Sequence, residues 1–566
     1  MTAPAIELVG SGGRLAAEVL ARSGVEVVFT LSGGHLFPFY DGCVQTGIRL
    51  VDTRHEQTAT FAAEGWAKVT RTLGVAALTA GPGVTNGISA LTSAAMCGAP
   101  VLVIGGRAPA ARWGQGSLQE LDHVPIVAPV TKYAATIPAA AAVPVVLGEA
   151  IGAACRPHRG PAFVDVALDT QVEGAAVRID GVPPPPPVPP DDAELERVAR
   201  LLREAARPVL VAGADVYFGR AEAALAALAD ATGVPVFMNG LARGLLAADH
   251  PLAFARARSA ALAGADLVVV VGAPLDFRLG FGRFGDAAVV HCADHPERIA
   301  THVALAGATG GDLALTLERL ASRAGRRPAA DWVERLRAEE AARRAADAER
   351  MGDDREPIAP ARVYGELRRR LDRDAIVIGD GGDFVSYAGQ LIDSHEPGCF
   401  LDPGPFGCLG CGPGYTLAAG LARPGRQVVL LAGDGAIGFA LGDLDTLVRF
   451  GIDCTVMHPA ELAILGALDT LVRFGIDCTI VVGNNGIWGL EKHPMEQFFG
   501  YSVAAELRPG TRYDEVAVAL GAHGELVRTP ERLGPALDRA LATPGVSVVN
   551  VLTDPADAYP RSSNLA

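Results

Sequence analysis

Two short stretches far apart in the chain hold the side chains best suited to chemistry. Gly433-Asp434-Gly435 lies in the C-terminal part and is followed by Asn484-Asn485. Asp and Asn supply the hard oxygen ligands that Mg²⁺ prefers, and glycines let backbone N–H groups approach phosphate oxygens. In the N-terminal part, Arg54-His55-Glu56-Gln57 supplies a carboxylate for proton transfer. The two stretches predict a magnesium-bound diphosphate site and a separate acid.

The elements that must position these residues show an α/β pattern. Near-continuous Val, Ile and Leu runs that end in Gly or Asp are typical of parallel strands buried on both faces. Examples are VEVVFTL, VAALTAG, PVLVAGA, DLVVVVGA, QVVLLAGDG and CTIVVGNN, and amphipathic Ala- and Leu-rich stretches separate such runs. The pattern predicts parallel sheets flanked by helices, with ligands at the carboxyl ends of the strands.

The length of 566 residues is too great for a single core and predicts several domains. The composition breaks at the proline-rich segment 183–190, which is typical of a stiff spacer, and at the charged helical stretch 331–350. These breaks predict three domains at residues 1–180, 191–345 and 356–550, followed by a tail at residues 551–566.

Composition excludes several function classes. The net charge of −15 argues against binding to a nucleic-acid backbone. No run of about 18 apolar residues suggests a membrane span, and the N-terminus lacks the pattern of a signal peptide, so a cytoplasmic protein is expected. The nine cysteines show neither paired zinc spacing nor the density of a disulfide scaffold. Cys408 and Cys411 form a CxxC, but reduced thiols are expected there too.

An internal repeat interrupts the C-terminal part. The segment LDTLVRFGIDCT occurs at residues 444–455 and again, letter for letter, at residues 468–479, so the second copy begins 24 residues after the first. Only the second copy runs directly into IVVGNN, and we expect it to form the strand before Asn484-Asn485. The first copy is expected to form an added helix-like excursion, or to reflect an artefactual duplication of the sequence.

Together with the segment TAGPGVTN at residues 79–86, these motifs resemble the thiamine diphosphate enzymes of the acetolactate synthase-like superfamily along nearly the whole chain. The resemblance implies a pyrimidine-binding domain, a central nucleotide-fold-like domain and a diphosphate-binding domain. It assigns Glu56 to protonation of the aminopyrimidine ring, a task that suits a carboxyl group whose pKa is raised in an apolar pocket. The alternative for Glu56 is a surface carboxylate near a helix start.

The same resemblance implies a set of magnesium and diphosphate residues. Asp434 and Asn485 would bind Mg²⁺ through side chains and Ile487 through its carbonyl. Leu409 stands where a bulky aliphatic residue props the cofactor into a bent shape, a role that coincides with ordinary core packing. The cofactor-binding residues expected besides Glu56 are Gly381, Asp383, Leu409, Gly433, Gly435, Ala436, Ile437, Asn485, Trp488 and Gly489.

The resemblance also implies partners. The acid and the metal motif lie in different domains, and in this superfamily these domains come from different subunits, so a homodimer or a dimer of dimers is expected. The central domain of relatives binds FAD or ADP or nothing, and here ADP is favoured over FAD. Arg258, Arg278 and Asp294 are its candidate ligands, although charged loop residues are more often solvated.

Within the superfamily, phrases such as VDTRHEQTA and NNGIWGLEKHPM look most like the 2-hydroxyacyl-CoA lyases. This branch would cleave a 2-hydroxyacyl-CoA into formyl-CoA and a ketone or aldehyde. Glu491 would shuttle a proton, or else favour a helix dipole as an N-terminal Glu. His35 and Gln119 would line the same pocket, His35 being nearly as well explained as a structural histidine. The tail with Arg561 would close over the acyl-CoA substrate as a lid or be disordered.

Other functions remain open at this point. An acetolactate synthase-type carboligase acting on pyruvate is the first alternative, and an oxalyl-CoA decarboxylase is another. A non-enzymatic relative that binds a nucleotide is a different class, against which the retention of Glu56, Asp434 and Asn485 argues.

Overall fold

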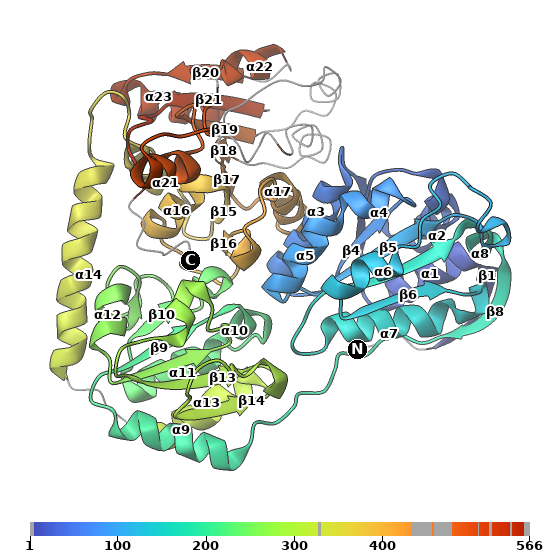
Figure 1. Ribbon diagram of the computed structural model, residues 1–566, viewed down its shortest axis with the longest axis horizontal. Helices are drawn as coiled ribbons and strands as arrows, with labels where there is room; N and C mark the ends of the chain where they lie inside the picture. Colours follow the sequence, from blue (N-terminus) through green and yellow to red (C-terminus); the bar gives the residue numbers. More distant parts are fainter. Residues whose placement is uncertain are drawn as a thin grey trace.

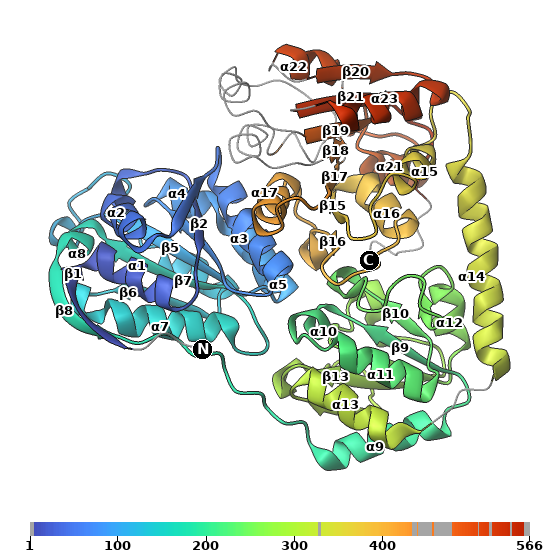
Figure 2. The same cartoon turned by 180° about the vertical axis from the view of Figure 1, so that it is seen from behind.

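The computed structural model describes residues 5–325, 330–432, 439, 455–457, 478–507, 509–519, 523–543 and 546–559. Three parallel sheets flanked by helices form its framework, which confirms the α/β class expected from the buried apolar runs. Figure 1 shows the N-terminal sheet on one side, and the central and C-terminal sheets stacked along the other. The long helix α14 (Ala330–Met351) runs beside the last two sheets, as Figure 2 shows from behind.

The N-terminal sheet has the order β3-β2-β4-β5-β7-β6, and a separate antiparallel pair joins β1 to β8. Its strands are β1 (Ile6–Ser11), β2 (Val27–Thr30), β3 (Arg49–Asp52), β4 (Gly74–Leu78), β5 (Val101–Arg107), β6 (Tyr133–Ile137), β7 (Ala162–Ala167) and β8 (Gly174–Ile179). The helices are α1 (Gly12–Arg22), α2 (Phe37–Thr46), α3 (Glu56–Thr70), α4 (Pro82–Asn86), α5 (Ile88–Cys97), α6 (Val124–Val127), α7 (Val143–Cys155) and α8 (Leu168–Val172). Strands β2 and β4 are buried along their whole length, as the apolar runs predicted.

The central sheet has the order β11-β10-β9-β12-β13-β14, and all its strands are parallel. Its strands are β9 (Pro208–Ala212), β10 (Val236–Met238), β11 (Ala253–Phe254), β12 (Leu267–Val271), β13 (Ala288–Ala293) and β14 (Gly307–Gly310). The helices are α9 (Asp192–Glu204), α10 (Ala214–Phe218), α11 (Glu222–Thr232), α12 (Arg258–Gly264) and α13 (Leu313–Ala324). The proline-rich segment 183–190 precedes α9 and contains no helix or strand.

The C-terminal sheet has the order β16-β15-β17-β18-β19-β21-β20. Its strands are β15 (Ile376–Asp380), β16 (Phe400–Leu401), β17 (Val428–Ala432), β18 (Thr455–Met457), β19 (Cys478–Asn484), β20 (His523–Val527) and β21 (Val546–Leu552). The described helices are α15 (Pro360–Arg368), α16 (Gly382–Leu391), α17 (Gly412–Ala422), α21 (Gly489–Phe499), α22 (Tyr513–Ala519) and α23 (Pro530–Ala542). The strands are parallel, so their carboxyl ends meet at one edge.

The two repeat copies end in neighbouring strands of this sheet. The second copy leads into β19 and the Asn pair, as expected. The described end of the first copy, Thr455, begins strand β18, and Thr455 lies opposite Thr479, the same position of the second copy. An added helix-like excursion is therefore wrong for this end, because the β-branched and apolar residues that follow Thr455 fill a place between β17 and β19. The rest of the first copy lies outside the described residues.

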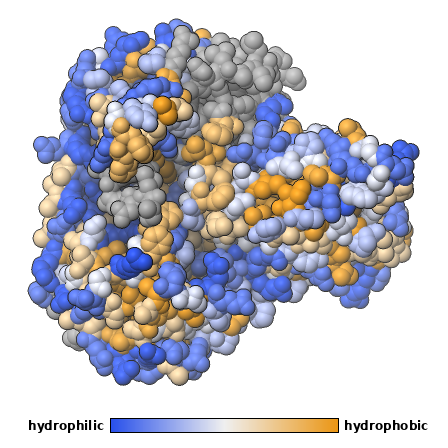
Figure 3. Space-filling view, viewed as in Figure 1, coloured by the Kyte–Doolittle hydropathy of each residue, from blue (hydrophilic) through white to orange (hydrophobic). Residues whose placement is uncertain are grey.

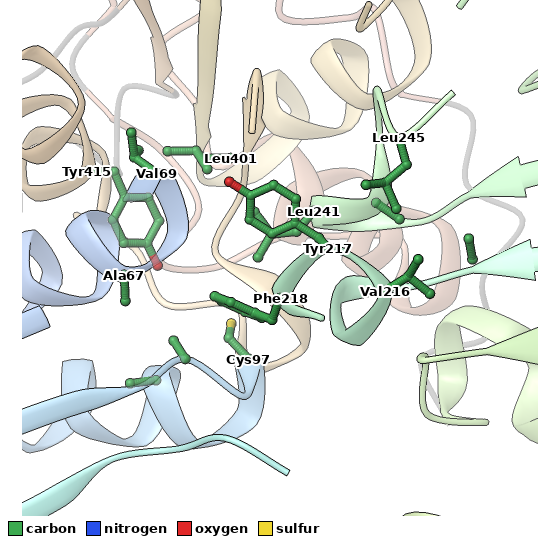
Figure 4. Close-up of a cluster of buried hydrophobic side chains, with 14 of the residues drawn as sticks. Ala67, Val69, Cys97, Val216, Tyr217, Phe218, Leu241, Leu245, Leu401 and Tyr415 are labelled. Atoms are coloured by element: carbon green, nitrogen blue, oxygen red, sulfur yellow. The ribbon is translucent and has the colours of Figure 1, made fainter. Parts of the chain in front are cut away.

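A shared apolar core joins the three sheets. Figure 4 shows Ala67 and Cys97 of the N-terminal domain facing Tyr217 and Phe218 of the central domain and Tyr415 of the C-terminal domain. Helices α3 and α17 lie side by side in both ribbon views. The amine of Lys68 is fully buried there and pairs with Glu64 at 2.9 Å. The same amine donates to the Tyr415 hydroxyl at 2.8 Å and to the Asp402 carbonyl at 3.1 Å, which ties the N-terminal domain to the C-terminal domain.

The molecular surface is mainly hydrophilic, with apolar patches. Figure 3 shows one of these patches over the N-terminal domain near α4. The free thiols among the described residues are Cys43, Cys97, Cys155, Cys292, Cys399, Cys408 and Cys411. Within the part of the chain that the structure describes, no helix is long and apolar enough to cross a membrane.

Candidate active site

The carboxyl group of Glu56 lies in a pocket at the start of α3. His55 caps this helix, with its ring nitrogen accepting a hydrogen bond from the Gln57 N–H at 3.1 Å. Glu56 is only 8% exposed, and the side-chain amide of Asn86 donates to its Oε2 at 3.1 Å. The surface carboxylate considered from the sequence is therefore not what the structure shows. A carboxyl group at this place can exchange a proton with a group bound in the pocket.

The segment at residues 79–86 forms the wall that Glu56 faces. The backbone of Gly83 lies close to Thr79 and Glu56. A Cβ at Gly83 would lie 2.7 Å from Cγ2 of Thr79 and 3.6 Å from Oε1 of Glu56. Gly81 has φ +61° and ψ −113°, a conformation that side chains strain to adopt. The two glycines therefore keep the space beside the acid open.

His35 and Gln119 lie against the same segment, as the sequence predicted for one pocket. The His35 ring is within 3.4 Å of the Thr79 hydroxyl. Burial lowers the pKa of His35, although hydrogen bonds with the Leu118 backbone and the Gln119 side chain oppose this effect. Gln119 has φ +60°, a strained backbone for a residue with a side chain, and its Cβ would crowd any Cβ at Gly81. A neutral His35 can accept or donate a hydrogen bond here.

The second part of the site lies at the carboxyl edge of the C-terminal sheet. Helix α16 begins at Gly382, directly after Gly381, and both glycines have positive φ angles of 58° and 68°. Helix α21 begins at Gly489, where a Cβ would lie only 2.1 Å from Oδ2 of Asp383. The structure therefore brings the predicted residues Gly381, Asp383 and Gly489 together. Two helix N-termini at one place favour an anion.

The Asn pair follows β19 at this edge. Asn484 is buried and its amide donates to the Thr511 carbonyl at 3.1 Å, so it acts as a structural residue. Asn485 is partly exposed, and its Oδ1 accepts from the Ile487 N–H at 3.1 Å. Trp488 is the residue before α21 and is half-buried. The predicted residues Gly433, Asp434, Gly435, Ala436 and Ile437 lie outside the described residues.

Asp380 organises the loop that carries Leu409. Its carboxylate is fully buried and accepts from the backbone N–H groups of Gly410 at 3.1 Å and Gly412 at 2.7 Å. Burial raises the pKa of Asp380 to about 6, although these two donors oppose the shift. The carbonyl of Leu409 accepts from the Gln57 side chain at 3.4 Å, which places Leu409 beside the start of α3 in the same chain.

Glu491 lies in the first turn of α21 and its side chain is exposed. This position fits the helix-dipole explanation weighed from the sequence. The structure of a single chain does not bring Glu491 into the group around Glu56, and its role in proton transfer remains a prediction.

Comparison with known proteins identifies the architecture around these residues. The N-terminal TPP binding domain of thiamine pyrophosphate enzymes matches residues 10–126. The central domain of these enzymes matches residues 195–320, and their C-terminal TPP binding domain matches residues 380–458 and 461–551. The chain belongs to the thiamine pyrophosphate enzyme family.

Two groups of relatives resemble this thiamine pyrophosphate enzyme. A probable acetolactate synthase of Mycobacterium bovis and the acetolactate synthase large subunit IlvG of Mycobacterium tuberculosis are each 54% identical, over 100% of this chain and 99% of the relative. The human 2-hydroxyacyl-CoA lyase 2 is 33% identical, over 92% of this chain and 85% of the relative.

The residues of this thiamine pyrophosphate enzyme fit the cofactor that its family binds. The glycine at position 83 leaves room beside Glu56 for the pyrimidine, and a side chain would fill that space. The α16 and α21 N-termini would hold the diphosphate, and the oxygen of Asn485 is a suitable ligand for its metal ion. Mg²⁺ is the ion that the family generally uses, and Asp434 would be its other side-chain ligand.

A separate cavity lies between the central domain and its two neighbours. Its empty space measures about 720 Å³ when the solvent-filled mouth is included. Gly213, Asn239 and Gly272 come from strand ends of the central sheet, and Arg278 and Arg298 supply positive charge. The cavity residues are Lys68, Met96, Cys97, His158, Gly213, Ala214, Asp215, Asn239, Gly240, Leu241, Gly272, Ala273, Pro274, Arg278, His291, Ala293, Arg298, Asp402, Gly404 and Pro405.

Of the three nucleotide candidates, only Arg278 lines this cavity. Arg258 does not, because its buried guanidinium donates to the Arg278 carbonyl. Asp294 lies at the rim, where its Oδ1 is 3.2 Å from Nδ1 of His158. Asp215 contacts the same nitrogen at 3.3 Å. Burial alone would lower the pKa of His158, but the two carboxylates raise it to about 9.

Sequence reasoning missed Asp380, His123 and Asp165. Asp380 and Asp165 each stand in an apolar strand, in IVIGD and AFVDVA, where an acid signals a buried partner. Such a signal does not name the partner. Asp165 pairs with His123, 42 residues earlier in the chain.

The tail beyond β21 is fixed to the C-terminal domain as far as it is described. Tyr559 packs edge-on against Tyr387 at 4.8 Å, and the Tyr387 hydroxyl donates to Asp557 at 3.3 Å. Arg561 lies outside the described residues, so closure of the tail as a lid remains a prediction.

Proposed function

We propose that the protein is a thiamine diphosphate-dependent carboligase of the acetolactate synthase type, which joins two molecules of pyruvate with loss of one CO₂. The observation that carries this proposal is the buried Glu56 carboxyl, held by Asn86 beside the open Gly83 wall. The two relatives at 54% identity over the whole chain bear this activity in their names, which supports it over the lyase favoured by the sequence motifs.

The cofactor, when bound, supplies a carbanion at C2 and a ring that accepts electrons. Glu56 holds the proton at the pyrimidine nitrogen and orients that ring. His35 and Gln119 offer polar groups to the substrate from the same side, and the neutral form of His35 suits hydrogen bonding to a carbonyl oxygen. The N-termini of α16 and α21 and the Asn485 side chain would hold the diphosphate end of the cofactor and its metal ion.

We further propose that two copies form the active unit, as the family resemblance implies. Leu118, next to Gln119, is 78% exposed, and Figure 3 shows an apolar patch near α4. Apolar surface beside the Glu56 pocket is suited to contact with a second copy. In the family the acid and the diphosphate site come from different subunits, and a second copy would complete each site in this way.

A nucleotide is the proposed occupant of the central cavity. Its glycine-rich strand ends and the side chains of Arg278 and Arg298 favour an anionic ligand such as ADP. Thermal stabilisation by ADP that is reduced in Arg298→Ala would support this assignment, and stabilisation that is equal in both proteins would contradict it.

A second enzymatic candidate is the 2-hydroxyacyl-CoA lyase reaction. Relatives named 2-hydroxyacyl-CoA lyase 2 from human and Caenorhabditis elegans are 33% and 32% identical over more than nine tenths of this chain. The motifs VDTRHEQTA and NNGIWGLEKHPM also resemble that branch. In this reaction the C1–C2 bond of the acyl group breaks, which yields formyl-CoA and a ketone or aldehyde, and a group such as Glu491 would move the hydroxyl proton.

The deciding experiment is a product assay by mass spectrometry. Purified protein with thiamine diphosphate and Mg²⁺ is given either pyruvate or a short branched 2-hydroxyacyl-CoA, with Glu56→Ala as the control. Acetolactate from pyruvate, lost in the control, is the expected result. Formyl-CoA with a ketone or aldehyde would replace the proposal by the lyase activity, and no product from either substrate would contradict both.

A further inference from the structure

We infer that His123 is a positioning residue that holds the 81–83 segment against Glu56 through a buried relay from Asp165. This inference rests on the proposed function, because it concerns the acid that would act on the cofactor. His123 has no exposed side-chain surface and therefore cannot contact a substrate itself. Its effect on the reaction must pass through the residues that it holds.

The hydrogen bonds of His123 define its tautomer. The Gly81 N–H donates to Nε2 of His123 at 2.9 Å, so Nε2 must carry a lone pair. Nδ1 of His123 lies 2.9 Å from Oδ2 of Asp165 and must donate its proton there. A neutral ring with the proton on Nδ1 satisfies both contacts, and no other protonation state does.

Asp165 is anchored from its other side by Arg107. The Arg107 guanidinium donates to the same Oδ2 at 2.8 Å and stacks on the Trp113 ring at 3.9 Å. Asp165 itself is fully buried in β7. The guanidinium of Arg107, which also donates to Asp122 at 3.1 Å, supplies positive charge beside the buried carboxylate.

The contact matters because it pairs the N–H of Gly81, while the Gly81 carbonyl accepts separately from the Thr85 N–H at 3.1 Å. Its φ of +61° and ψ of −113° belong to a region that only glycine visits at low cost, and glycine is also the most flexible residue. A buried N–H without an acceptor is costly, so loss of the His123 contact would favour a rotation of this peptide. Pro82 and Gly83 follow at once, and Gly83 is the residue whose backbone faces Oε1 of Glu56.

Gln119 belongs to the same arrangement. Its backbone carbonyl and Cβ would each lie 3.0 Å from a Cβ at position 81, so movement of Gly81 would also displace the side chain that hydrogen-bonds His35. Through Gly81, His123 thus links the polar residues Gln119 and His35 to Asp165 on strand β7. A shift of about 1 Å in such a group can lower turnover about 100-fold.

The tautomer of His123 can be measured in the wild-type protein. Long-range ¹H–¹⁵N spectra of histidine-labelled protein are assigned for His123 by comparison with His123→Gln. A ring protonated on Nδ1 alone is the expected result. A ring protonated on Nε2, or on both nitrogens at neutral pH, would overturn the relay.

The functional test compares two substitutions of the same residue. His123→Phe keeps the volume but removes the acceptor, whereas the side-chain oxygen of His123→Gln can occupy the place of Nε2. The first readout is hydrogen–deuterium exchange at C2 of bound thiamine diphosphate, which needs no substrate. We expect the exchange rate to fall about 10- to 100-fold in His123→Phe and to recover largely in His123→Gln.

Further measurements distinguish a positioning role of His123 from a general loss of structure. They also keep the test independent of which substrate the protein uses. In His123→Phe, kcat for whichever substrate is accepted should fall with the exchange rate, while KM changes less than about threefold. Equal exchange rates in wild type and His123→Phe would overturn the inference, and so would equal loss in both variants. If neither substrate reacts, the exchange rate and the tautomer still decide the role of His123.

Discussion

The two halves of the active site occupy the same place in similar parallel sheets but offer opposite electrostatics. In the N-terminal domain, the carboxyl end of the sheet presents an acid, Glu56, with a single amide donor from Asn86. In the C-terminal domain, the corresponding edge presents the N-termini of α16 and α21, with glycines at Gly381, Gly382 and Gly489. In the proposed function, the first half would exchange a proton and the second would bind the diphosphate anion, so one sheet topology would serve two chemical tasks.

The two halves also differ in how tightly they are built. Around Glu56, the 79–86 segment is fixed by buried side chains, including His123 and Thr79. The start of α21 instead lies so close to α16 that a Cβ at Gly489 would be 2.1 Å from the Asp383 carboxylate, so this place needs a glycine. The difference teaches that proton transfer needs fixed polar side chains, whereas diphosphate binding needs bare backbone N–H groups.

The largest effect is expected for Glu56→Ala, which removes the acid of the N-terminal half. We expect kcat to fall about 100- to 10,000-fold, because a positioned acid contributes that much to proton transfer. Cofactor affinity should change far less, since the anion-holding half is intact. Steady-state kinetics and a thermal titration with thiamine diphosphate measure the two effects, and a joint loss of affinity and turnover would argue that Glu56 has mainly a structural role.

Mixing two defective variants tests whether the two halves of one site come from different copies of the chain. If each site combines the acid of one copy with the diphosphate edge of another, Glu56→Ala and Asn485→Ala should complement each other. Equal mixing with free exchange should restore about a quarter of wild-type activity, since half the dimers are mixed and each has one intact site. Mass measurement of the mixed dimer is the control for exchange. Mixed dimers without activity would show that both halves come from one chain.

Gly489→Ala tests the anion-holding half alone. The added Cβ would lie 2.1 Å from Oδ2 of Asp383, so the Asp383 carboxyl group or the start of α21 must shift. We expect the Kd for thiamine diphosphate with Mg²⁺ to rise about 10- to 100-fold, as for displaced supporting groups in metal sites. Gly152→Ala is the matched control, because no atom lies within 4 Å of its Cβ position. Equal Kd values for the two variants would contradict the assignment.

The smallest effect is expected at the contact between the N-terminal and central domains. The pKa of His158 is raised to about 9, above its ordinary value of 6.5, by Asp215 and Asp294. A raised pKa stabilises the folded protein fully below pH 6.5, and the contribution is lost as pH rises through 9. Wild type should exceed His158→Gln in unfolding free energy by about 1–3 kcal/mol at pH 6.

This difference should shrink toward pH 10, and denaturant titrations of both proteins across this range provide the measurement. A difference that stays constant with pH would show that His158 acts only through packing. A difference that grows with pH would contradict the assigned charge state.

Sequence reasoning found the parts of the site whose signals are local. Glu56 stands at a helix start and Asn485 directly after an apolar strand, and both positions follow from the order of residues. Arg258, a predicted nucleotide ligand, donates to the carbonyl of Arg278 and does not line the central cavity. The expected helix-like excursion does not hold at Thr455. A strand forms there, paired with β17 on one side and β19 on the other.

The sequence by itself determined the alternation of buried strands and helices, the family and the residue types at the site, because these depend on periodicity and short motifs. Only the tertiary structure decided which polar groups meet. His123 joins Asp165 across 42 residues, and His158 meets Asp215 and Asp294 from another domain. These pairings depend on where buried charges find partners after the sheets have packed, and packing is a property of the whole fold.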